Sequence, residues 1–287
     1  MPSMNPSLHC SLPTLARRVL VLILLLGLSF QATAQQYRIL VTNDDGIDSP
    51  LLAVLKEELQ ALPGVTVVVS APRENQSGAS NSTIGSPLVV ERIFRDGTLF
   101  GYGVHGRPAD AVTFGLAQLA EEGPFDLVVS GINAGANVGD VAHGSGTVGA
   151  ALRAMLLGTP ALAVSQETSG VDTRATARFA AGIVQRFRQD GAPQGVLLSV
   201  NVPGGTLKGV RVRPMGESYL ARSPYRIVEE NGNTVTYESA YVRQAAEDPA
   251  TDTFAYQDGY ITVTPLRFDW TANELLPALE SWNLQLP

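Results

Sequence analysis

The sequence predicts an α/β fold built on a doubly wound, mostly parallel sheet. Short apolar runs recur along the chain, and they are continuous rather than alternating, which is typical of strands buried on both faces. Segments with helical spacing separate these runs. The 28 Gly and 18 Pro are scattered without a period, which indicates many tight loops. Strands that alternate with helices favour parallel pairing, because the crossover connection needs a helix.

The expected elements follow in chain order. Pro50 occupies a first helical position, and Pro63-Gly64 ends that helix. Asp96-Gly97 supplies the turn of a hairpin over 88–105. Buried strands are predicted at 37–42, 65–70, 125–130, 161–165 and 196–200, and helices at 49–62, 108–121 and 147–157.

After Pro203 the pattern becomes alternating, which predicts a β-rich extension over about 204–265. It contains a hairpin turning at Asn231-Gly232-Asn233 and a strand at 260–264, and a short helix at 270–279 closes the chain. A lone hairpin is barely stable in water, so we expect it to pack on the main body or to reach a second subunit.

The first 34 residues have the layout of a secretory signal peptide. Arg17-Arg18 precedes an apolar run over 19–30, and Ala32-Thr33-Ala34 is a small-x-small cleavage pattern. The run is too short for a comfortable bilayer span, so no permanent membrane anchor is expected. The mature protein would then be one domain over 35–287, periplasmic or secreted, with the cytoplasm as the alternative location.

Composition excludes several kinds of chemistry. The only cysteine, Cys10, lies in the leader, so the mature chain lacks disulfides, a thiolate nucleophile and thiolate-bound zinc. The net charge is −7, and it becomes −9 once the two leader arginines are removed. An acidic chain argues against a nucleic acid polymer as partner, because phosphate backbones bind basic faces.

Two adjacent carboxylates follow the first predicted strand, in Asn43-Asp44-Asp45-Gly46. The carboxyl ends of strands line the ligand crevice of an open α/β sheet. Neighbouring carboxylates repel each other, and a bound Mg²⁺ or Mn²⁺ relieves the repulsion with hard oxygen ligands. The alternative is an Asx turn that caps the next helix.

Three further polar segments are expected at the same edge. A loop of small residues spans 77–82, Asn133 and Asn137 lie in a Gly-rich loop, and Ser145-Gly146-Thr147 precedes a helix. The helix start offers free N–H groups to an anion, although Ser145 also fits a simple N-cap. Carboxylates for a metal beside an anion site describe metal-assisted hydrolysis of a phosphate ester.

The sequence resembles the SurE survival-protein family of metal-dependent nucleoside monophosphate phosphatases. The similarity runs through most of the mature chain, and its motifs occur in order: ILVTNDDG at 39–46, SGASNS at 77–82, GRPAD at 106–110, VVSGINAGAN at 128–137, SGTVGA at 145–150 and YITVTPL at 260–266.

The resemblance implies a site and a reaction. One divalent cation per subunit, Mg²⁺ or Mn²⁺, would be held by Asp44, Asp45, Ser77 and Asn133, with the two aspartates as the catalytic residues. The phosphate pocket would comprise Asn137, Ser145, Gly146 and Thr147. The substrate would be a nucleoside 5′-monophosphate, with 3′-nucleotides and short polyphosphate as further candidates. A homodimer or homotetramer with an exchanged C-terminal arm is also implied.

This chain departs from the family pattern at three positions. Gly144 replaces the usual Tyr, Val141 the usual second Asp, and Arg107 the usual Thr, which makes Arg107 either an added positive charge near the substrate or a solvated loop residue. The leader is a further departure, because the family is generally cytoplasmic. His143 is a candidate acid for the leaving oxygen, whereas His105 is a weaker one.

Two other functions compete with this interpretation. An exported, non-enzymatic binding protein would use the metal structurally. A phosphoacceptor signalling domain would need an acceptor Asp after a later strand, where this chain has Ser130-Gly131 instead.

Overall fold

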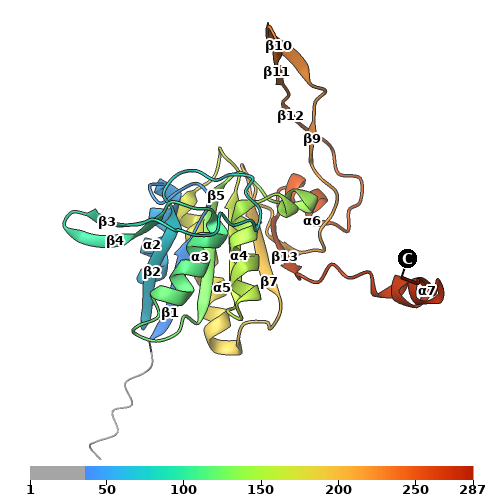
Figure 1. The fold of residues 1–287 in the computed structure, drawn as a ribbon. Helices are drawn as coiled ribbons and strands as arrows, with labels where there is room; N and C mark the ends of the chain where they lie inside the picture. Colours follow the sequence, from blue (N-terminus) through green and yellow to red (C-terminus); the bar gives the residue numbers. More distant parts are fainter. Residues whose placement is uncertain (1–35, 287) are drawn as a thin grey trace, which may run out of the picture. The chain divides into compact units, whose positions relative to one another are not determined.

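The computed structural model describes residues 36–286, so the predicted signal peptide lies outside the described residues. A nine-stranded sheet forms the centre of this unit, in the order β3-β4-β2-β1-β5-β6-β7-β13-β8 (Figure 1). Pairing is parallel from β4 across to β7, which confirms the predicted mostly parallel sheet. The strands are β1 (Tyr37–Thr42), β2 (Val65–Pro72), β3 (Val90–Arg95), β4 (Thr98–Val104), β5 (Leu127–Ala134), β6 (Ala161–Gln166), β7 (Leu197–Val202), β8 (Val210–Val212) and β13 (Ile261–Leu266).

Helices cover both faces of the sheet. The helices α2 (Pro50–Gln60) and α5 (Thr173–Asp190) pack on one face, and α3 (Pro108–Gln118) and α4 (Gly146–Leu156) pack on the other. Successive side chains of a strand point to opposite faces, so Ile39 and Val41 join the first core cluster and Leu40 joins the second. This two-sided burial explains why β1 reads as a continuous apolar run.

Several elements differ from the expected ones. The strand expected at 260–264 as part of the extension is β13 of the main sheet, where it runs antiparallel to β7 and parallel to β8. The predicted hairpin exists as β3 and β4, and β4 extends the sheet by pairing with β2. β5 continues to Ala134, so Asn133 belongs to a strand rather than to a loop. The 18-residue helix α5 was not among the expected elements.

The arm is the segment between β8 and β13. It contains β9 (Leu220–Arg222) paired with β12 (Tyr241–Arg243), and the hairpin of β10 (Arg226–Asn231) and β11 (Thr234–Glu238). The turn is Gly232-Asn233, because Asn231 is still paired in β10. The short helix α6 (Asp252–Gln257) then leads back into β13, and η2 (Asn273–Leu275) and α7 (Leu276–Ser281) end the chain. Within residues 36–286, no helix has the length and apolar character needed to cross a membrane.

Candidate active site

Asp44 is the buried carboxylate of the site. It follows β1 directly, its side chain is 3% exposed, and its Oδ1 accepts a hydrogen bond of 2.5 Å from the Thr147 hydroxyl. Thr147 lies in the first turn of α4, whose N-terminus carries the positive end of the helix dipole. The tertiary structure therefore places a helix start and a strand end, about 100 residues apart in sequence, in direct contact.

Gly146 is required by this contact. A Cβ at this position would lie 2.7 Å from the Asp44 Cβ and 2.9 Å from its Oδ2. Contacts under 3 Å between such atoms do not occur without movement, so any side chain here would push Asp44 away from α4. The N-cap of the same helix is Ser145, whose Oγ accepts from the Val148 N–H at 3.1 Å.

Asp45 is half-buried and is held by the neighbouring strand. Its Oδ2 accepts from the backbone N–H of Ala134 at 3.2 Å, and the Asn75 amide lies 3.5 Å from its Oδ1. Asn75 in turn accepts from the Ser77 N–H at 2.9 Å. Ser77 is thus connected to the carboxylates through Asn75, a residue that the sequence analysis did not single out.

Asn133 reaches the edge because β5 is irregular. The pairing of β5 with β6 shifts register between Ser130 and Asn133, and Gly131 within that step has a φ of +138°. A Cβ on Gly131 would lie 2.2 Å from the Val164 carbonyl oxygen, so only glycine fits. Such irregularities re-aim side chains. The Asn133 amide nitrogen donates to the Gly135 carbonyl at 2.6 Å, which leaves its oxygen as a possible ligand.

Burial raises the pKa of both carboxyls. Burial and the adjacent charge of Asp45 raise the pKa of Asp44 to about 6, although hydrogen bonds from Thr147 lower it in part. The pKa of Asp45 is also raised by burial, against the opposing effect of the Ala134 N–H. Within residues 36–286 neither carboxylate forms an ion pair with Lys, Arg or His.

The donor set fits a hard divalent cation. Two adjacent carboxylates lack a protein cation as partner, and neutral oxygens of Asn133 and Ser77 belong to segments linked to them. Asn43 Oδ1, from the same loop, is buried without a hydrogen-bond partner in the described chain. No group of three or more His, Cys, Asp and Glu side chains suited to a metal occurs in residues 36–286. Oxygen ligands of this kind favour Mg²⁺ or Mn²⁺ over zinc.

The residues expected in the phosphate pocket are buried in the protein. Asn137 is 7% exposed, its amide donates to the Ser165 hydroxyl at 2.8 Å, and its backbone N–H donates to Asn201 Oδ1 at 2.7 Å. Ser145 is also buried, and Thr147 is fully buried. The structure brings Thr147 and Gly146 to Asp44, and it anchors Asn137 to β6 and β7.

The loop over 77–82 packs against the start of α4. A Cβ on Gly149 would lie 2.1 Å from the Ser80 carbonyl oxygen, and the Ser80 hydroxyl donates to the His143 carbonyl at 2.8 Å. The Arg107 guanidinium donates to the Ser82 hydroxyl, so Arg107 ties this loop to the start of α3. Arg107 is half-buried and bonded to this loop, so it is not a freely solvated side chain.

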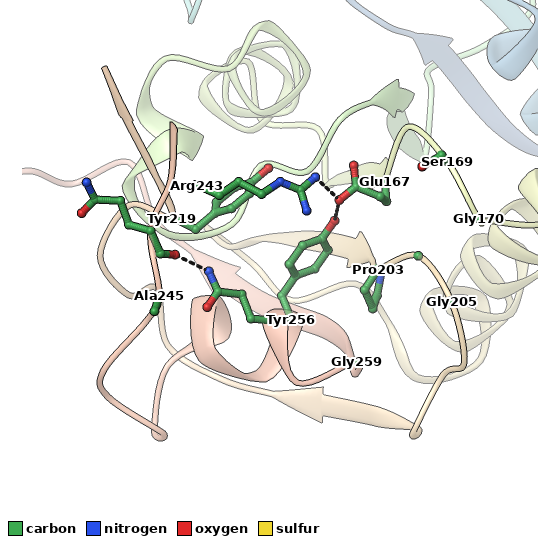
Figure 2. Close-up of a pocket in the computed structure, with 13 residues that line it drawn as sticks. Glu167, Ser169, Gly170, Pro203, Gly205, Tyr219, Arg243, Ala245, Tyr256 and Gly259 are labelled. Carbon is green, nitrogen blue, oxygen red and sulfur yellow. Dashed lines mark hydrogen bonds and ion pairs between the residues drawn. The ribbon is translucent and has the colours of Figure 1, made fainter. Parts of the chain in front are cut away.

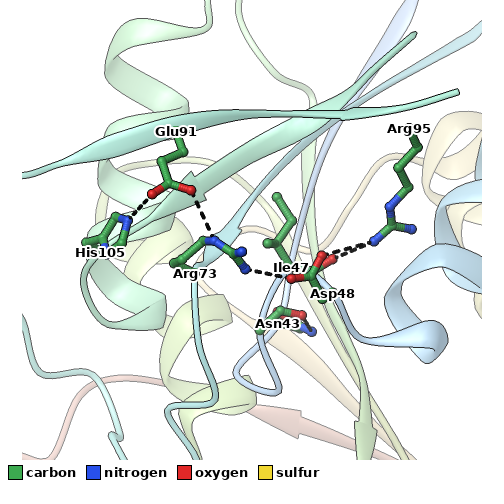
Figure 3. Close-up of polar contacts among 8 residues, drawn as sticks. Asn43, Ile47, Asp48, Arg73, Glu91, Arg95 and His105 are labelled. Atoms are coloured by element: carbon green, nitrogen blue, oxygen red, sulfur yellow. Dashed lines mark hydrogen bonds and ion pairs between the residues drawn. The ribbon is translucent and has the colours of Figure 1, made fainter. Parts of the chain in front are cut away.

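A chain of ion pairs supports the loop that carries Asp45. His105 Nε2 lies 2.7 Å from Glu91, Glu91 contacts Arg73 at 3.1 Å, and Arg73 contacts Asp48 at 2.6 Å (Figure 3). Arg95 completes the chain through Asp48 and through the Ile47 carbonyl. These side chains are substantially exposed, so the pairs orient β2, β3 and β4 around the loop more than they stabilise the fold. His105 therefore has a structural partner away from the carboxylates.

Asp252 of α6 connects the C-terminal part of the chain to the site. It is 2% exposed and accepts from the N–H groups of Gly139 and Gly216, at 3.3 and 2.8 Å, and from the Thr264 hydroxyl at 3.0 Å. Gly139 begins the 3-10 helix η1 (Gly139–His143), which leads to the Ser145 cap. The C-terminal part of the chain therefore anchors η1, the segment that precedes α4, which agrees with the expectation that the extension packs on the main body.

These features define a class of protein: an open, doubly wound α/β fold whose carboxyl edge pairs two unneutralised carboxylates with a helix N-terminus. The survival protein SurE family model matches residues 39–222, and the chain belongs to this family.

Named relatives agree with the family match. A 5′-nucleotidase SurE of Thermoanaerobacter sp. is 33% identical over 253 residues, which is 87% of this chain and 99% of that relative. A 5′-nucleotidase SurE of Nitratidesulfovibrio vulgaris is 40% identical over 250 residues, covering 85% and 98%. The crystal structure of the SurE protein from Aquifex aeolicus superposes with a TM-score of 0.74 at 32% identity, covering 86% of this chain and all of that one.

Proposed function

We propose that this chain is a phosphoric monoester hydrolase that cleaves nucleoside 5′-monophosphates to nucleoside and phosphate. The observation that carries the proposal is the pair Asp44 and Asp45, unneutralised by protein cations in residues 36–286, beside the first turn of α4. The 5′-nucleotidase names of its relatives supply the substrate class. Activity on 3′-nucleotides and short polyphosphate is part of the same proposal.

One Mg²⁺ or Mn²⁺ per subunit would be held by Asp44, Asp45, Asn133 and Ser77. When bound, the cation supplies a Lewis acid and lowers the pKa of coordinated water. Thr147 fixes the Asp44 carboxylate, and the Ala134 N–H fixes that of Asp45. Asp45 is the more exposed of the two, so it is the carboxylate accessible to an attacking water.

The first turn of α4 would stabilise the phosphoryl oxygens as negative charge accumulates on them. Water attacks phosphorus and loses a proton, the phosphorus–oxygen ester bond breaks, and the leaving nucleoside oxygen gains a proton, so the products are a nucleoside and inorganic phosphate. Asn137, Ser145, Gly146 and Thr147 would form or support this pocket, with Asn137 acting through the buried network that anchors it. His143 is exposed at the end of η1 and is the proposed proton donor to the leaving oxygen.

The test is phosphate release by chelator-treated protein from nucleoside 5′- and 3′-monophosphates, with Mn²⁺, Mg²⁺ or no metal. We expect metal-dependent release, abolished by Asp45→Asn. Asp96→Asn is the matched control, because Asp96 is an exposed hairpin-turn residue at positive φ, where Asn is tolerated. A folded, Mn²⁺-binding protein that released no phosphate would support the alternative of a non-enzymatic binding protein.

Two further aspects belong to this proposal. Exposed apolar side chains on the arm and the C-terminal segment favour a homodimer or homotetramer; they include Tyr225, Ile227, Tyr237, Tyr241, Val242, Trp270, Trp282 and Leu286. Light scattering after size exclusion would show a monomer if the idea is wrong. The leader-like sequence over 1–34 supports export to the periplasm or beyond, and an uncleaved protein confined to the cytoplasm would contradict it.

A further inference from the structure

A cavity of about 630 Å³ lies beyond the carboxyl ends of β6 and β7 (Figure 2). Its walls come from the loops at 167–170 and 203–205, from α6 and from the arm just after β12. This volume is within the usual range for small-molecule sites. The cavity thus lies at the same edge of the sheet as the two carboxylates.

Two buried tyrosines form an aromatic wall of this cavity. The rings of Tyr219 and Tyr256 have centroids 5.9 Å apart, and both side chains are at most 5% exposed. Tyr256 donates to Glu167 at 3.2 Å, and Tyr219 donates to the Ala136 carbonyl at 3.3 Å. Because their hydroxyls are bonded to the protein, the rings are fixed in position.

The arm closes one side of the cavity through a salt bridge. Arg243 contacts Glu167 Oε2 at 2.7 Å, which is the oxygen that Tyr256 also bonds. Gln257 donates to the Gln244 carbonyl at 2.6 Å and accepts from the Ala246 N–H at 2.9 Å. The Gln244 side chain lines the cavity, and its amide makes no hydrogen bond within residues 36–286. Gln244 is exposed, so its amide is accessible to a ligand with polar edges.

A smaller hollow of about 170 Å³ adjoins this cavity on the side of β5. It shares Glu167 and Ser169 with the cavity, and it is also lined by Ala134, whose N–H bonds Asp45. β1, β5 and β6 are neighbours in the sheet, so the ends of β1 and β6 lie roughly 10 Å apart at the usual strand spacing. The cavity and the carboxylates thus lie at neighbouring strand ends of the same sheet edge.

We propose that this cavity binds the nucleoside part of the substrate, with the base against the Tyr219 and Tyr256 wall and its polar edge toward Gln244. The small exposed parts of the two fixed rings give the base an apolar boundary, and an amide offers both a donor and an acceptor to a base edge. The inference rests on the proposed function and adds that residues after β12 contribute to substrate specificity.

The test fills the cavity without touching its bonded network. Ala245 is exposed and lines the cavity, so Ala245→Trp places a large side chain there; Ala250→Trp is the control, on an exposed alanine of the same segment outside the lining. KM and kcat are measured for adenosine 5′-monophosphate and for glycerol 2-phosphate, which has no base. We expect Ala245→Trp to raise the KM for the nucleotide at least tenfold and to change that for glycerol phosphate less than twofold. Ala250→Trp should match the parent protein.

Gln244→Ala is the milder variant, with an expected three- to tenfold rise in the nucleotide KM alone. Equal changes for both substrates, or no change for either, would overturn the proposed subsite. Calorimetric titration of the chelator-treated protein with adenosine gives a readout independent of turnover, and Ala245→Trp should weaken that binding at least tenfold. If no phosphate ester is hydrolysed, the proposed function fails, whereas adenosine binding unaffected by Ala245→Trp rejects the subsite.

Discussion

The Thr147 hydroxyl donates to Asp44 Oδ1 at 2.5 Å, joining the first turn of α4 to the loop after β1. This bond orients a carboxylate that is almost completely buried. Thr147 is therefore a positioning residue for Asp44, whatever the α4 N-terminus contributes to the phosphate itself.

Two substitutions of Thr147 test the effect of its hydroxyl separately from the effect of its methyl group. Thr147→Val removes the donor and should lower kcat/KM tenfold or more, since a hydrogen bond to a charged group contributes about 1.5–3 kcal/mol. Thr147→Ser retains the donor and should stay within threefold of the parent. The Mn²⁺ affinity, measured by titration, should fall for the valine variant alone. Equal behaviour of the two variants would show that the hydroxyl does not position Asp44.

Gly149 provides a test of the packing between α4 and the loop at 77–82. A methyl group here would lie 2.1 Å from a backbone oxygen of Ser80, so Gly149→Ala should destabilise the fold by about 1–3 kcal/mol through overpacking. Urea unfolding measures the change. Gly182→Ala in α5 is the control, because nothing lies within 4 Å of its added Cβ.

The control substitution should stabilise α5 by about 0.5–1 kcal/mol, because alanine loses less backbone entropy than glycine in a helix. If both variants unfold at the same urea concentration, the 77–82 loop does not press on α4 as the structure describes.

Asp252 should matter for both stability and activity. An asparagine at this position offers one acceptor oxygen where the carboxylate offers two, so it leaves a buried N–H or hydroxyl without a partner. Asp252→Asn should cost about 1–3 kcal/mol of unfolding free energy and lower kcat, because η1 loses its anchor at Gly139.

The matched control is Asp258→Asn, which removes a carboxylate that is 46% exposed and pairs with Lys208. That pair is at the surface, so its loss should change stability by less than about 1 kcal/mol. Similar losses of stability in the two variants would mean that Asp252 does not anchor η1 at Gly139.

The raised pKa of Asp44 predicts a pH-dependent stability for the metal-free protein. The folded value is about 6 and the reference value is 3.8, so the folded state binds this proton more tightly than the unfolded state does. Stability from this group is present below pH 4 and is lost as the pH rises to about 6, by at most about 3 kcal/mol.

Urea unfolding in chelator between pH 4.5 and 7 checks this expectation. Asp44→Asn should reduce the decline to the smaller part that Asp45 contributes. Saturating Mn²⁺ should reverse the decline in the parent protein at pH 7, because a ligand that binds only the folded state stabilises it. A parent protein whose stability followed that of Asp44→Asn across the whole range would contradict the assignment.

Most strands of the central sheet could be predicted from the hydrophobic pattern of the sequence and from the positions of Gly and Pro. Continuous apolar runs located β1, β2, β5, β6 and β7, because strands buried on both faces carry apolar residues at every position. Asp44 and Asp45 were predicted as site residues from their place directly after β1, and this stays a prediction. In contrast, β13 was assigned to the extension, since alternation describes a half-buried strand without saying which sheet it joins.

The sequence by itself determined the doubly wound, mostly parallel sheet, and it predicted the residue types proposed to carry the chemistry. Only the tertiary structure decided that Gly146 touches Asp44, that the Ala134 N–H bonds Asp45, and that Asp252 anchors Gly139. The first kind of information is local, because it depends on spacing along a strand or a helix. The long-range contacts depend on backbone groups and on close approaches between segments that are distant in the chain. The amino-acid types of these residues do not predict such contacts.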